Sequence, residues 1–193
     1  NGMCFQSRPT VRDHAGTFFW KSKDIKMTSL DIHFLHGFGM VGQHSENITM
    51  DDVDFEAPKE SGRTTAGYAD FVQMSGCKGT INISNCTFAG PHDDPINIHG
   101  TFNTVTAISS DRRTITVQYN HNETAGFPNF FEGDEIEFMT KGNMITVEDS
   151  VRTVTKVDGP DGMGGNMGDG SGSLTTIKLT LNEAVPSDVQ VNQ

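Results

Sequence analysis

A short apolar pattern that occurs three times is the feature that most constrains the fold of this chain. The copies begin at residues 25, 48 and 81, at intervals of 23 and 33 residues. They read Ile25-x-Met27-x-x-Leu30-x-Ile32, Ile48-x-Met50-x-x-Val53-x-Phe55 and Ile81-x-Ile83-x-x-Cys86-x-Phe88. Apolar runs at such spacing, separated by Gly, Asn, Asp and Ser, are typical of successive coils of a parallel β-helix. Leucine-rich repeats fit less well, because their leucine and asparagine spacing is missing.

Four shorter apolar runs interleave with the copies and predict a second strand in each coil. These runs are Thr17–Trp20, Gly39–Gly42, Phe71–Met74 and Pro95–Ile98. The 33-residue interval is interpreted as a normal coil with an insertion, and Ala57–Thr65 is the obvious inserted loop. Loops of this kind often form the wall of a binding groove.

After Gly100 the pattern changes to longer alternating strands, which are typical of an antiparallel barrel or sandwich. The expected strands are Thr104–Ile108, Thr114–Tyr119, Glu135–Met139, Met144–Val147, Val151–Val157 and Leu174–Leu181. A hairpin turn is expected at Ser109–Arg113, and a loop at the glycine-rich segment Gly159–Gly172. The sequence therefore predicts an all-β chain, with parallel β-helix coils over residues 1–102 and an antiparallel β-barrel or sandwich over residues 103–193.

Composition narrows the classes of function. The formal net charge of -11 disfavours binding to nucleic-acid phosphates or anionic lipid, whereas a neutral sugar is a compatible ligand. No apolar stretch approaches the roughly 18 residues that are needed to span a bilayer. The three cysteines, an odd number with no CxxC pair, do not predict a disulfide framework.

Three aspartates are the strongest candidates for chemistry. Asp93 and Asp94 stand immediately before the run Pro95–Ile98, and Asp70 stands before Phe71–Met74. Because equivalent positions on neighbouring coils lie about 4.8 Å apart, Asp70 and Asp94 are expected to face one another. In an extended backbone, the Asp93 carboxyl group would lie farther from Asp70 than that of Asp94 does. Glycoside hydrolysis needs such a set, one carboxylic acid and one carboxylate, and clustering raises at least one pKa.

Polar and aromatic residues near these acids are candidates for sugar binding. They are His92, Asn97 and His99 around the paired aspartates, His36, Arg63 in the inserted loop, and Trp20 as a stacking face. Two other interpretations of the acids stay open at this point. Asp93 and Asp94 could be turn residues before Pro95, or stacked aspartates could bind calcium.

Four segments resemble glycoside hydrolase family 110, a family of exo-acting α-1,3-galactosidases. They are Tyr68–Phe71, Cys86–Phe88, His92–Thr101 and Gly133–Phe138. The resemblance implies a right-handed parallel β-helix of the pectin-lyase-like kind with an inserted β-barrel. It also implies an inverting mechanism without a metal or other cofactor, and terminal α-1,3-linked galactose on glycans as the substrate. A periplasmic or extracellular location is implied as well.

The same resemblance assigns roles to the acids. Asp93 corresponds to the general acid, and Asp70 and Asp94 correspond to the pair that positions and deprotonates water. Family members continue the β-helix after the barrel, so the sequence is expected to be a piece of a longer enzyme that lacks some substrate contacts and is itself weakly active or inactive. Exposed coil ends would favour self-association.

Two further functions remain as alternatives to a glycosidase. One is a non-catalytic carbohydrate-binding or adhesion β-solenoid, which would bind sugar without the three acids. The other is a β-helical polysaccharide lyase or uronic-acid epimerase, which would need basic residues or calcium to neutralise a uronate.

Overall fold

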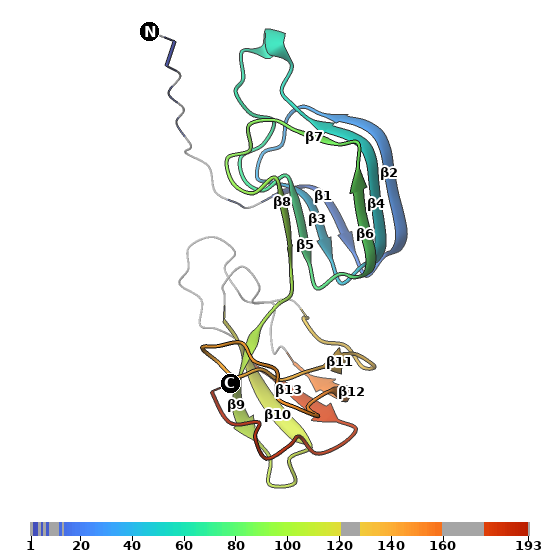
Figure 1. Ribbon diagram of the computed structural model, residues 1–193, viewed down its shortest axis with the longest axis vertical. Coiled ribbons are helices and arrows are strands. Elements are labelled where there is room, and N and C mark those ends of the chain that lie inside the picture. Colours follow the sequence, from blue (N-terminus) through green and yellow to red (C-terminus); the bar gives the residue numbers. More distant parts are fainter. Residues whose placement is uncertain are drawn as a thin grey trace. The chain divides into compact units, whose positions relative to one another are not determined.

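The computed structural model describes residues 2, 3, 5, 7, 12, 14–120, 128–159 and 176–192. The chain divides into two compact units, Asn1–Gly100 and Thr101–Gln193, and each unit has its own hydrophobic core. Both units are built from strands, so the expected all-β class is confirmed (Figure 1). The expected loop at 159–172 lies outside the described residues except for Gly159. Within the described residues, no helix is long and apolar enough to cross a membrane.

The first unit contains two parallel sheets whose strands alternate along the chain. One sheet has the order β1-β3-β5-β8, and the other has the order β2-β4-β6, with β7 also pairing with β4. The strands are β1 (Ala15–Trp20), β2 (Lys23–Ile32), β3 (Phe38–Gln43), β4 (Glu46–Phe55), β5 (Val72–Ser75), β6 (Lys78–Ser84), β7 (Thr87–Phe88) and β8 (Ile96–His99). Successive strands of one sheet therefore come from successive repeats of the sequence.

The repeated pattern stacks in register. Ile25 pairs with Ile48, which pairs with Ile81, and the same alignment continues through the later apolar positions to Phe55 and Phe88. Apolar side chains from all three copies pack in one core, with the exception of Leu30, which is 38% exposed. In this core the Phe55 ring stacks on Phe88 at 5.3 Å between ring centroids. The interval between copies in the sequence is thus the number of residues that the chain needs to come back to the same row of the sheet.

Positive backbone φ angles recur at matching places in successive repeats, where the chain bends. The three rows are Lys21, His44 and Gly76; then Asp24, Asn47 and Gly79; then Ser29, Asp52 and Asn85. Six of these nine residues are Asn, Asp or Gly, the types that adopt this conformation at least cost. One row is also linked by side chains, because Asn47 donates from Nδ2 to Asp24 Oδ1 at 2.9 Å. The polar residues between the apolar runs therefore set the bends.

The long interval between β4 and β5 is an irregular loop with one short 3₁₀ turn, Lys59–Ser61. The turn begins after Pro58 and ends at Gly62, whose φ is 68°. The returning part of the loop is anchored, because the backbone N–H of Leu35 donates to the carbonyl of Ala66 at 2.7 Å. The insertion therefore leaves the stack and rejoins it with β3 and β5 in continuous register, while the pairing of β4 with β6 shifts once between Glu46 and Ile48.

The second unit is a five-stranded antiparallel sheet with the order β11-β12-β13-β10-β9. Its strands are β9 (Asn103–Ile108), β10 (Thr114–Tyr119), β11 (Glu135–Ile136), β12 (Arg152–Asp158) and β13 (Thr176–Leu181). The core contains Ile115, Tyr119 and Leu179, each at most 1% exposed. The expected strand Met144–Val147 is wrong: the positive φ of Met144 interrupts the extended backbone there, and only an isolated bridge between Met139 and Thr146 forms.

Candidate functional site

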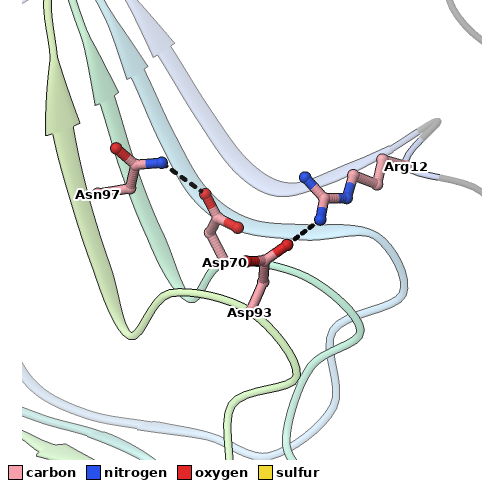
Figure 2. A network of polar contacts seen from close by, with 4 residues as sticks. All are labelled: Arg12, Asp70, Asp93 and Asn97. Carbon is pink, nitrogen blue, oxygen red and sulfur yellow. Dashed lines mark hydrogen bonds and ion pairs between the residues drawn. The ribbon is translucent and has the colours of Figure 1, made fainter.

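Asp70 is a buried carboxyl group placed by a local break in strand alternation. Phe71 and Val72 are consecutive, yet both are 0% exposed in the same core, so the backbone entering β5 does not alternate its side chains. The Asp70 side chain lies beside Asn97 of β8 and is only 3% exposed (Figure 2). Asn97 donates from Nδ2 to Asp70 Oδ2 at 3.2 Å. Two neighbouring strands thus hold this acid.

Asp94 continues the same row of the sheet. Val72 pairs with Ile96, and the register extended back by two residues places Asp70 next to Asp94. The backbone supports this extension, because the N–H of Phe71 donates to the Asp94 carbonyl at 3.1 Å. Asp94 is exposed, whereas Asp70 is buried, so two neighbouring acids occupy different environments.

Asp93 lies at a bend of the chain beside Asp70 (Figure 2). The chain bends at His92 and Asp93, and the Asp93 carboxylate lies near that of Asp70 (Figure 2). Asp93 has a stronger effect on the pKa of Asp70 than Asp94 has. The expectation that Asp94 would be the nearer charge assumed an extended chain, whereas the chain bends at these residues.

Burial raises the pKa of Asp70 above its ordinary value of 3.8. The hydrogen bond from Asn97 opposes this shift, and so does the positive charge of Arg12, whereas the charges of Asp93 and Asp94 add to it. Desolvation is the largest of these causes. The surroundings of Asp70 thus favour its protonated form.

Arg12 is a member of the site that the sequence did not reveal. Its guanidinium forms an ion pair with Asp93 through Nη2 and Oδ2 (Figure 2), and its centre lies 5.4 Å from the centroid of the Phe38 ring. The two charged side chains are 32% and 39% exposed. Arg12 and Asp93 are 81 residues apart, and no motif surrounds Arg12, so only the folded chain connects them.

Three other predicted residues share one cavity. His36, Arg63 and His92 line a cavity of about 370 Å³, together with Phe34 and Tyr68. The guanidinium centre of Arg63 lies 4.5 Å from the centroid of the Phe34 ring. His92 immediately precedes Asp93, so this cavity borders the acidic cluster. The inserted loop therefore does form a wall, as its position in the sequence predicted.

Trp20 and His99 are not brought to the acids. Trp20 pairs with Gln43, Gln43 with Ser75, and Ser75 with His99, so these residues share the row at the far end of the sheet. His99 is five residues along the strand from Asp94, a separation of roughly 16 Å at the usual rise. Neither residue shares the cavity or the polar contacts described above.

The calcium interpretation gains no support from the described residues. Among them, no group of three or more His, Cys, Asp or Glu side chains is arranged to hold a metal ion. What the site offers is a buried carboxyl group with a raised pKa beside two more exposed carboxyl groups and an arginine. Carboxyl groups in different environments can divide acid and base roles between them, as glycoside hydrolysis requires.

Comparison with known proteins identifies close relatives. A family model described as GLAA-B beta-barrel domain II matches residues 114–160, within the second unit. Alpha-1,3-galactosidase A of Streptomyces avermitilis is 47% identical over 189 residues, which are 98% of this chain and 29% of that protein.

Two enzymes of Bacteroides thetaiotaomicron extend the comparison. Its alpha-1,3-galactosidase A is 46% identical over 74% of this chain and 25% of that protein. Its alpha-1,3-galactosidase B is 34% identical over 76% of this chain and 24% of that protein. The chain thus spans less than a third of the length of these relatives.

Proposed function

Because the chain belongs to the family of the α-1,3-galactosidases A and B, we propose that it is part of a glycoside hydrolase that removes terminal α-1,3-linked galactose from glycans. The relatives are named as α-1,3-galactosidases, which supports this substrate class. The observation that carries the proposal is the gathering of Asp70, Asp93 and Asp94 from the starts of two neighbouring strands.

The proposed mechanism inverts the anomeric carbon. Asp93 acts as the general acid on the glycosidic oxygen, and Asp70 and Asp94, neighbours in one row, hold and deprotonate the attacking water. In the free site, Arg12 forms an ion pair with Asp93. The substrate must therefore loosen this ion pair before Asp93 can carry the proton that the leaving oxygen receives.

The electrostatics also support a second assignment. The pKa of Asp70 is raised, which favours a resting proton on Asp70, and Asp93 is paired with Arg12. In this alternative, Asp70 is the proton donor and Asp93 activates water. Hydrolysis of α-galactosyl fluoride separates the two, because fluoride leaves without protonation. Whichever residue is the general acid, its Asn variant should retain far more activity on the fluoride than on a disaccharide. Asp93→Asn should do so in the first assignment, and Asp70→Asn in the second.

The architecture proposed for the complete enzyme follows from the stacking of repeats. The two alternating parallel sheets and their repeated bends support a right-handed parallel β-helix, and the match of the second unit supports an inserted β-barrel. Extracellular or periplasmic glycans are the proposed partners, and the net charge of -11 is compatible with such neutral ligands. Metal ions and cofactors have no part in the proposed mechanism.

The proposal is tested with α-1,3-galactobiose and NMR detection of the released anomer. The chain should release β-galactose, and Asp93→Asn should lower kcat by about a thousandfold, since general acid catalysis contributes roughly 10² to 10⁴. Asp31→Asn is the matched control, because this exposed aspartate lies on β2 in the other sheet. Release of α-galactose would contradict inversion, and unchanged activity of Asp93→Asn would contradict both the role and the site.

A further inference from the structure

The cavity beside the acids has walls that are fixed by backbone contacts. Thr65 and Ala66 are buried at 8% and 2% exposure, and the Ala66 carbonyl accepts the hydrogen bond from Leu35. Thr65 Oγ1 also donates to the Gly67 carbonyl at 2.8 Å, which closes a tight turn. The inserted loop is thus held against the Phe34–His36 segment, and the cavity is a formed feature of the fold.

A third contact ties the loop to the acidic segment. Gly90 has a φ of +64°, and a Cβ atom there would lie 2.5 Å from the Thr64 carbonyl oxygen. Only glycine lets the two backbones approach so closely. Gly90 is two residues before His92, so the position of the Asp93 carboxylate is coupled to the position of the loop that carries Arg63.

The chemistry of the lining suits one sugar ring. Arg63 offers several N–H donors in one plane, and its place over the Phe34 ring fixes that plane. Phe34 is 53% exposed and adds apolar surface, which suits the C–H face of a sugar. The described residues that line the cavity include no Asp or Glu, so acceptor hydroxyl groups meet donors there without competition from carboxylates.

The position of the cavity decides which sugar it takes. In an inverting site, the general acid stands on the side of the leaving group, and the water-activating carboxylates stand on the opposite face of the cleaved sugar. His92 lines the cavity, whereas Asp70, Asp93, Asp94 and Asn97 do not. Because His92 directly precedes Asp93, the cavity adjoins the proposed general acid through His92, and this adjacency assigns it to the leaving-group side.

We propose that the cavity formed by Phe34, Arg63 and His92 binds the saccharide that departs when galactose is cleaved, with Arg63 as its main hydrogen-bond donor. This inference rests on the proposed function, because it takes Asp93 as the acid. It assigns the inserted loop to recognition of the glycan beyond the terminal galactose.

Two substrates separate this role from the chemistry. α-1,3-Galactobiose has a sugar leaving group, whereas α-galactosyl fluoride has none. Arg63→Ala and Phe34→Ala should each lower kcat/KM for the disaccharide by about tenfold, the usual cost of one lost hydrogen bond to a charged donor or of one lost ring contact. Hydrolysis of the fluoride should change by less than twofold.

Arg113→Ala is the matched control, because Arg113 is an exposed arginine of the second unit and should affect neither substrate. Equal losses on both substrates in Arg63→Ala would place the terminal galactose in the cavity and overturn the inference. Unchanged kinetics on both substrates would overturn it as well. In either case the wild-type activity would still stand, so the proposed function would survive.

If the chain cleaves neither substrate, that result would count against the proposed function. A binding measurement then still tests the assignment of the cavity. Saturation-transfer NMR with methyl β-galactoside should show ligand signals with the wild-type chain and with Arg113→Ala. The signals should weaken severalfold with Arg63→Ala. Absence of wild-type signals, or signals unaffected by the Arg63 substitution, would overturn the assignment of the cavity.

Discussion

At the scale of single residues, the burial of Asp70 makes stability depend on pH in a defined direction. Its pKa is raised, so the folded chain binds the proton more tightly than the unfolded chain does. The contribution of Asp70 to the free energy of unfolding is therefore fully present below pH 3.8, the ordinary value, and is lost as the pH rises through the folded-state pKa. A site acid that costs stability at neutral pH is a sign of function.

Asp70→Asn should consequently make the first unit more stable at pH 7, because the neutral amide needs no ionisation. The advantage should shrink as the pH falls toward 3.8. Urea unfolding followed by the fluorescence of Trp20, the single tryptophan and part of the first unit, measures it. Asp51→Asn is the control of opposite sign, since hydrogen bonds from Asn85 and Ser84 lower the Asp51 pKa. Loss of stability in Asp70→Asn at pH 7 would contradict the account.

At the scale of elements, the stacked aromatic rings join the strands of the first unit. Phe55 is 0% exposed and lies between Phe71 and Phe88, with ring centroids 5.2 and 5.3 Å away. Because Phe71 follows Asp70, this stack also supports the acid. The packing between the strands and the position of Asp70 thus both depend on the side chains of this aromatic stack.

Phe55→Ala should destabilise the first unit by about 3–5 kcal/mol, the range for removal of a buried phenylalanine. The cause is a cavity at the centre of the stack. Urea unfolding monitored at Trp20 gives the value, and Phe18→Ala serves as control because Phe18 is 58% exposed. Equal small effects of the two substitutions would show that the stack contributes little.

The elements also show how far sequence analysis reaches. The strands of the first unit were predictable, because the apolar repeats must return to the same rows of a sheet. The grouping of Asp70 with Asp94 followed from the same register. Arg12 was not predictable, since its partner is 81 residues away, and the place of Asp93 was missed because a bend at two residues has no periodic signal. Trp20 and His99 were chosen for their chemistry, and the register separates them from the acids.

At the scale of the whole molecule, two separate cores predict two separable unfolding events. Leu179 is 0% exposed in the second unit, so Leu179→Ala should lower the stability of that unit by roughly 2–5 kcal/mol. The transition seen by Trp20 should not move. Circular dichroism follows the unfolding of both units, whereas Trp20 fluorescence follows only the first. Comparing the unfolding transitions from the two methods tests this prediction. A shift of both transitions together would show that the units unfold as one.

The loop between β4 and β5 leaves the sheets and rejoins them in register, and this has a consequence for evolution. Residues can be gained or lost in such a loop at little cost to the strands, because the rows on either side are set by other contacts. The acids stand on the rows, whereas Arg63 stands on the loop. Reaction and recognition are thus carried by parts of the chain that can change at different rates, so relatives could diversify the glycans they accept while keeping one cleavage chemistry.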